Sequence, residues 1–290
     1  MMISAPVSAG GRVPTTGILA ELAPITLDAL LVNASLQTRV DRKYLLPRAA
    51  LEPVLVHLGH DTQVLEIDGV RAFGYESIYF DTPGNDSYLM AARKRRHRFK
   101  IRTRSYLDSA ECYLEVKTRG GRSLTVKDRL EYSIHNRAQL TTEARDYTNA
   151  VLRESGIVGA EQFELAPVLT TRYRRSTLYI PTSQSRATID LSLSWSDDAA
   201  KLDLPELAVV ETKSGSTPSA VDRLLWSHGH RPASLSKFGT GRAALRPDLP
   251  SNKWNRILTT HFAQPAIATG PATSGPVTTA LFSTRTTHRK

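Results

Sequence analysis

The chain has 290 residues, 40% of them hydrophobic and 23% charged, which is enough for one large domain or two small ones. Its 38 lysines and arginines outnumber its 28 acidic residues, and the formal charge of +10 favours an anionic partner such as nucleic acid, a phosphate compound or an acidic membrane surface. The single cysteine, Cys112, excludes an internal disulfide and a cysteine-based zinc site.

The two ends of the chain differ in composition from its middle. Residues 1–17 are small, polar and rich in glycine and proline, and residues 249–290 are rich in threonine, serine, alanine and proline, so both predict flexible segments. Residues 18–248 then form one folded domain. No stretch is long and apolar enough for a transmembrane helix, and the start lacks a basic region followed by an apolar one. We therefore expect a cytoplasmic protein with no membrane segment.

The middle of the chain contains both kinds of regular structure. Alternating apolar and polar residues predict strands at residues 38–46, 75–81, 167–178, 186–193 and 208–213, and three more within 99–134. Helical spacing and capping residues predict helices at residues 24–32, 47–59, 140–154 and 219–228, with a short helix or turn at 88–98.

The stretch 99–134 is the most informative, because its strands have two unlike faces. In its first strand Lys100, Arg102 and Arg104 alternate with apolar residues, and a Glu-x-Lys pair follows at Glu115 and Lys117. A solvated sheet face is the simplest interpretation of one such strand, but that face would mix charges of both signs. Repeated arginines and lysines with a few carboxylates instead suit a polyanion and its metal ions.

These strands predict the architecture. About eight strands with one cationic face and one apolar face indicate an α+β fold, in which an antiparallel β barrel is closed or nearly closed. The charged faces would point into the barrel and the helices would cover the apolar faces outside. The basic run at residues 93–98 is compatible with a nucleic-acid patch or with a plain solvated segment. Because few exposed aromatic residues lie among the basic ones, we do not expect nucleic acid as the partner.

Nine short motifs follow one another in order across residues 24–245. They are RVDRKY (39–44), YFDTP (79–83), IRTRSY (101–106), YLEVKT (113–118), VKDR (126–129), TTRYRR (170–175), RATID (186–190), VVETKS (209–214) and LSKF (235–238). Each motif is weak alone, but together they resemble the VTC-type polyphosphate polymerase domain, a branch of the triphosphate tunnel metalloenzymes. The first motif has Asp41 where the wider superfamily often has glutamate, in agreement with the VTC branch.

The resemblance implies an eight-stranded antiparallel tunnel that binds a chain of phosphates. Residues that match the family's motifs imply the site. The catalytic set would be Lys43, Arg102, Arg104, Lys117, Arg172, Arg186 and Lys237. Further substrate contacts would come from Lys127, Arg129, Ser236, Lys213 and Glu115, and Glu211 would bind the metal. Asp41 and Asp190 are expected to orient neighbouring arginines or lysines.

The resemblance also implies the reaction. The γ-phosphoryl group of ATP would pass to a growing polyphosphate chain with release of ADP, and Mn²⁺ or Mg²⁺ would help to neutralise the phosphates. ATP and polyphosphate are the expected partners. Two alternatives are a hydrolase of triphosphate or polyphosphate and a non-catalytic polyphosphate-binding protein. The residues do not decide between the two metals or set an oligomeric state.

Overall fold

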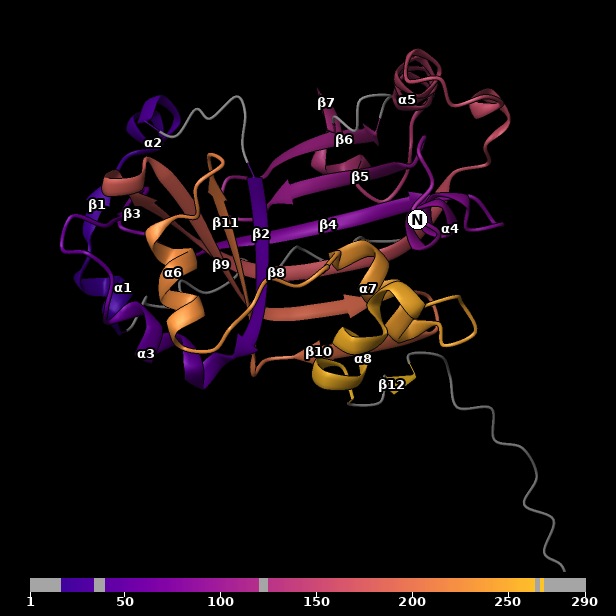
Figure 1. Cartoon of the computed structure of the whole chain (residues 1–290). Helices are drawn as coiled ribbons and strands as arrows, with labels where there is room; N and C mark the ends of the chain where they lie inside the picture. Colours follow the sequence, from indigo (N-terminus) through magenta and orange to yellow (C-terminus); the bar gives the residue numbers. More distant parts are fainter. Residues whose placement is uncertain (1–16, 34–39, 120–124, 264–266, 269–290) are drawn as a thin grey trace, which may run out of the picture.

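The computed structural model describes residues 17–33, 40–119, 125–263 and 267–268, and one large sheet forms its centre (Figure 1). Within these ranges the sheet has 12 strands. They are β1 (Ala23–Ile25), β2 (Val40–Pro47), β3 (Gln63–Leu65), β4 (Phe73–Asp81), β5 (Phe99–Tyr106), β6 (Glu111–Arg119), β7 (Thr125–Glu131), β8 (Ala166–Ile180), β9 (Ser185–Ser196), β10 (Ala200–Leu204), β11 (Leu207–Ser214) and β12 (Ile267–Ala268). The helices are α1 (Ile18–Glu21), α2 (Leu27–Asn33), α3 (Leu51–Leu55), α4 (Asp86–Ala92), α5 (Thr142–Glu154), α6 (Ala220–Ser227), α7 (Lys237–Leu245) and α8 (Asn255–His261).

Eight of the strands form a continuous antiparallel path in the order β2-β11-β9-β8-β4-β5-β6-β7. The predicted α+β fold with an antiparallel sheet and outer helices is therefore confirmed. Of the predicted alternatives, a closed or a nearly closed barrel, full closure is not seen, because no ladder joins the edge strands β2 and β7 in the described residues. Short strands extend the sheet at its sides: β3 pairs with β8, and β10 pairs with β9.

The sheet branches at β9, whose first half pairs with β11 and whose second half pairs with β10. Between these halves the pairing with β8 shifts: Arg172 faces Ser194, but Arg174 faces Leu191. The additional residue lies on β9, where Ser192 has a φ of 54°. Such a bulge bends a strand and increases its twist, which lets one strand serve two neighbours that diverge.

The helices cover the outer face of the sheet. In β5 every second residue is buried outward, from Phe99 and Ile101 onward, and α5 packs there through Val151 and Leu152. The helices α3 and α6 pack on the outer faces of β2, β9 and β11, while α7 and α8 cover the other end of the sheet. In the described ranges no helix has the length and apolar character needed to cross a membrane.

The predicted C-terminal tail needs a correction, because part of it is folded. Residues 252–261 form a 3₁₀ turn and α8, and the Trp254 side chain is only 1% exposed. Ile257 and Phe262 are buried in the same cluster. Three large apolar residues within ten positions are enough to hold this segment against the sheet. The predicted flexible start at 1–16 and most of the residues after 263 lie outside the described residues.

Candidate functional site

The inner faces of the strands, together with α2 and α7, surround a cavity of about 470 Å³. Its lining is strongly cationic. Among the described residues, ten lysines and arginines line it: Lys43, Lys100, Arg102, Arg104, Lys117, Lys127, Arg175, Arg186, Lys213 and Lys237. Only three carboxylates do so: Asp41, Glu115 and Glu211. This excess of cations is costly in a confined space, and a bound polyanion would relieve it.

Glu115 lies at the centre of one wall, where β6 pairs with β5 and β7. Arg102 donates to Glu115 Oε2 from Nε at 2.8 Å and from its terminal nitrogen at 2.5 Å. Lys127 Nζ lies 2.7 Å from Oε1 of the same carboxylate. Burial opposes the charge of Glu115, but Arg102, Arg104 and Lys127 outweigh it and hold the pKa of Glu115 well below its usual range. The carboxylate is ionised and is a weak base.

The excess positive charge lowers the pKa values of two lysines in the cavity. The charge of Arg102, burial of the side chain and the charge of Arg104 together lower the pKa of Lys117 to about 6. Burial and the charge of Arg102 lower the pKa of Lys100 to about 7, and its ammonium lies 2.9 Å from Ser236 Oγ. A bound phosphate would raise both pKa values again, because it supplies the missing negative charge.

Glu211 lies on the opposite wall, on β11. Lys213 Nζ is 2.5 Å from Glu211 Oε1, and Lys43 Nζ of β2 is 3.6 Å from it. Burial opposes the charge of this carboxylate, but Lys213, Lys43 and Arg175 hold the pKa of Glu211 well below its usual value. No group of three histidine, cysteine or acidic side chains gathers in the described ranges.

A buried carboxylate on β9 holds two of the cations in place. Asp190 is fully buried and accepts two hydrogen bonds from Arg175, at 2.6 and 2.8 Å, and one from Lys237. Lys237 Nζ also lies 4.4 Å from the centre of the Tyr173 ring. These contacts agree with the expectation that Asp190 orients its basic neighbours.

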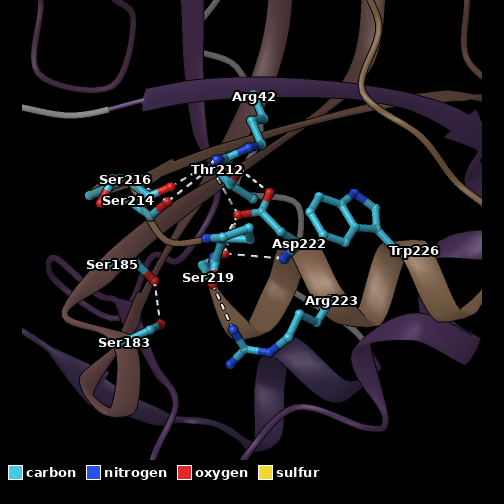
Figure 2. Close-up of polar contacts among 12 residues, drawn as sticks. Arg42, Ser183, Ser185, Thr212, Ser214, Ser216, Ser219, Asp222, Arg223 and Trp226 are labelled. Carbon is cyan, nitrogen blue, oxygen red and sulfur yellow. Dashed lines mark hydrogen bonds and ion pairs between the residues drawn. The ribbon is translucent and has the colours of Figure 1, made fainter.

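A buried hydrogen-bond network joins α6 to the outer side of β2 and β11, the strands that carry Lys43 and Glu211. Asp222 of α6 accepts from Tyr44 Oη at 2.6 Å and from Thr212 Oγ1 at 2.5 Å, and it forms a capping box with Ser219. Figure 2 shows Asp222 between Ser219 at the start of α6 and Thr212 of β11. Because side chains alternate along a strand, the outward Tyr44 and Thr212 set the inward direction of their neighbours.

The start of α7 reaches the cavity because two glycines let it lie close to the core. A Cβ at Gly239 would be 2.2 Å from the Trp254 ring, and one at Gly241 would be 2.1 Å from the Trp195 ring. Ser236 caps this helix by accepting from Gly239 N at 3.0 Å. The motif LSKFGTG thus brings Ser236 and Lys237 to the inner face of the sheet.

The cavity brings together most of the residues predicted from the motifs. Those that line it are Lys43, Arg102, Arg104, Glu115, Lys117, Lys127, Arg186, Glu211, Lys213, Ser236 and Lys237. Arg172 is different: it points outward, where its guanidinium pairs with Glu76 at 2.6 Å, and its side chain is 54% exposed. The segment RYRR has arginines on both faces of β8, so alternation alone does not show which face is inside. Arg175 is on the cavity side.

Arg129 is also outside the cavity. It shares a sheet face with Glu115, its partner in the β6–β7 ladder, but it lies exposed on the edge strand with its guanidinium 4.8 Å from the centre of the Tyr113 ring. Arg39, the first residue of the RVDRKY motif, lies outside the described residues.

The motif assignment left out several residues that line the cavity. Lys100 could have been included, because it shares the alternating face of Arg102 and Arg104. Arg175 and the rings of Tyr75, Tyr79 and Tyr173 are also present there. The guanidinium of Arg175 lies 5.3 Å from the centre of the Tyr75 ring and 5.2 Å from that of Tyr173. The contact between Arg175 and Tyr75 joins two strands, β8 and β4, so the order of residues along one strand does not reveal it.

Comparison with known proteins agrees with the motifs. The family model described as the VTC domain matches residues 38–246. Among solved structures, the Hippeastrum protein HpAC1, described as a candidate adenylyl cyclase with a dominant triphosphatase activity, has a TM-score of 0.43 and 16% identity, over 71% of this chain and 96% of that one. The protein PH1819 from Pyrococcus horikoshii OT3 has a TM-score of 0.38 and 16% identity, over 69% and 96%. No curated protein matches this chain.

Proposed function

Because this chain belongs to the VTC domain family, we propose that it transfers the γ-phosphoryl group of ATP to a growing polyphosphate chain inside its cavity and releases ADP. The observation that carries the proposal is the lining of ten basic residues against three carboxylates, in a space of about 470 Å³ within the described part of the chain. A chain of phosphates is the kind of ligand that matches so many converging cations.

The cations can neutralise charge on the phosphates during transfer. Phosphoryl transfer depends mainly on positioning and on stabilisation of negative oxygens, and the protein supplies little covalent chemistry. Arg102, held by Glu115, and Lys237, held by Asp190, are fixed before the substrate arrives. We assign Lys43, Arg102, Arg104, Lys117, Arg186 and Lys237 to the reacting phosphates, and Lys127, Lys213, Ser236 and Glu115 to the rest of the substrate.

The protonation states of Glu115 and Glu211 disfavour these two carboxylates as bases for transfer to water. A water molecule must lose a proton when it attacks, whereas the terminal phosphate of a chain already has a negative oxygen. Glu115 and Glu211 are held ionised by neighbouring cations, so neither accepts a proton readily near neutral pH. Hydrolysis is therefore the second candidate.

A divalent ion, Mn²⁺ or Mg²⁺, would be held by Glu211 together with phosphate oxygens. When bound, it would add positive charge next to the phosphates. Lys213 and Lys43, which contact Glu211 in the structure, would supply positive charge beside the same phosphates. In this arrangement Glu211 would be the protein ligand of the ion, and phosphate oxygens of the substrate would be further ligands.

The test is to incubate the purified protein with ATP and Mn²⁺ or Mg²⁺, and to follow long polyphosphate by gel staining together with ADP and free phosphate. Polymer with an equal amount of ADP supports the proposal. Free phosphate without polymer assigns a phosphohydrolase, and no turnover with either metal assigns a polyphosphate-binding protein.

Matched variants connect the activity with the cavity. Arg186→Gln removes a cation from the lining, whereas Arg172→Gln removes one from the outside of the same sheet. We expect the first to lower the rate about tenfold or more and the second to leave it within about twofold. Glu211→Gln should abolish turnover but leave polyanion binding largely intact. If Glu211→Gln retains full turnover, the assignment of Glu211 to metal binding is wrong.

A further inference from the structure

The cavity has an apolar wall at one end, and three of its four leucines come from outside the family domain. Leu27, Leu30 and Leu31 of α2 line the cavity together with Leu65 of β3. The helix α2 ends at Asn33, before the residues 38–246 that the VTC model matches. Leucine side chains do not contribute to the binding of phosphates, because apolar contact does not stabilise charged oxygens.

The leucine wall and the cluster around α7 lie at opposite ends of the cavity. β3 pairs with the end of β8 through Val64 and Leu178, on the side where β4 begins and β5 ends at Tyr106. At the other end Lys100, near the start of β5, reaches Ser236 at α7. Six residues of a strand separate these ends, which is about 20 Å. Figure 1 shows α2 and β3 at one side of the sheet and α7 and α8 at the other.

Two of the leucines are only partly covered by the protein. Leu30 is 2% exposed and belongs to a small core cluster with Ile25, Leu65 and Tyr179. Leu27 and Leu31 are 45% and 54% exposed, although they border the cavity. They therefore present apolar surface that a ligand with an apolar part would cover.

We propose that the leucine wall binds the base and sugar of the nucleoside triphosphate, and that it thereby sets the direction of the substrate in the cavity. The inference rests on the proposed function, because it needs a nucleotide as phosphoryl donor. A nucleotide has a base with flat π faces at one end and a polyanion at the other, and the cavity joins the exposed leucines of α2 to a cationic lining. Leu235 and Phe238 also line the cavity at its α7 end, but they are only 7% and 1% exposed. The rings of Tyr75 and Tyr106 line the same end as the leucines of α2; Tyr75 is already stacked on Tyr173, so Tyr106 is the ring that a base would approach.

This arrangement would direct the γ-phosphate toward Lys100 and Ser236. The growing chain would then occupy the α7 end, so that nucleotide and polymer meet head to head. The wall would also distinguish a nucleotide from an inorganic phosphate chain, which has the same charges but no base.

The test compares two ligands on matched variants of the full chain by isothermal titration calorimetry. Leu31→Ser shortens a leucine of the wall, and Leu27→Ser provides a second, independent change. Val32→Ser is the control, because Val32 is on the same helix, is 76% exposed and is not among the residues that line the cavity. We expect Leu31→Ser and Leu27→Ser each to weaken ATP binding about tenfold. Binding of inorganic tripolyphosphate should stay within about twofold, and Val32→Ser should change neither.

Other outcomes overturn the inference. Equal weakening of both ligands would mean that α2 only shapes the phosphate site, and unchanged ATP binding would place the base elsewhere. In both cases the proposed function stands. A wild-type protein that binds neither ATP nor tripolyphosphate overturns the proposed function as well. Thermal unfolding of each variant shows whether it is folded. Because Leu27 and Leu31 are partly exposed, we expect their replacement to change the unfolding temperature only slightly.

Discussion

Lys117 illustrates how charge crowding at a single residue couples to ligand binding. In the free protein its pKa is about 6, because Arg102, burial and Arg104 oppose its charge, and Lys127 adds to them while Glu115 favours it. A phosphate ligand favours the charged lysine and raises this pKa. Between the two pKa values the complex holds one proton more than the free protein, so binding takes up a proton and affinity falls as pH rises above about 6.

We therefore expect the affinity for tripolyphosphate to fall between pH 6 and 8, by up to about tenfold per pH unit for each such lysine. Lys100 should contribute above about pH 7, where its own pKa lies. Calorimetry in buffers of different ionisation enthalpy measures the proton uptake directly. The Lys117→Gln variant is the control for titration of the ligand itself, and its dependence on pH should be shallower. An unchanged dependence would contradict the assignment.

At the scale of an element, α7 depends on close contact between glycine and tryptophan. Gly241→Ala would normally stabilise a helix by about 1 kcal/mol. Here the new Cβ would be 2.1 Å from the Trp195 ring, so the helix must move. We expect a net loss of about 1–3 kcal/mol in the free energy of unfolding. Tripolyphosphate should also bind less tightly, since Ser236 and Lys237 move with the helix.

Denaturant unfolding and calorimetry measure the two effects. Gly215→Ala serves as the comparison, because a Cβ at that position meets nothing within 4 Å. If Gly241→Ala raises the stability as in an ordinary exposed helix, then α7 does not depend on this contact.

At the scale of the whole molecule, ten basic residues surround one cavity whose walls are not joined by a ladder between β2 and β7 in the described residues. Repulsion among them opposes folding, and a polyanion that bridges the walls removes it. Tripolyphosphate at about 100 times its dissociation constant should therefore add about 2.7 kcal/mol to the free energy of unfolding. This raises the unfolding temperature by several degrees.

Thermal unfolding with and without tripolyphosphate measures this stabilisation. High salt should reduce it, because ions screen the attraction. Arg172→Gln should keep the full increase and Arg186→Gln should lose part of it. An equal increase for both variants would mean that the ligand binds outside the cavity.

The antiparallel sheet with outer helices and a cationic inner face could be predicted from the order of the amino acids alone. Alternation in β2, β5, β6 and β11 separates a charged face from an apolar one, because a strand turns successive side chains to opposite sides. Arg102, Arg104, Glu115 and Glu211 could be assigned to one face in this way, and the ordered motifs indicated the family that the domain match then showed.

The tertiary structure was needed to show which face is inside where both faces carry arginine, as with Arg172 and Arg175 on β8. It also brought Lys237 to Asp190, 47 positions earlier in the chain, and packed Trp254 against the core. It showed that α2 lines one end of the cavity. Alternation describes how neighbours along a strand are oriented relative to one another, whereas these features depend on which distant segments pack together, and burial of apolar surface across the whole chain sets that packing.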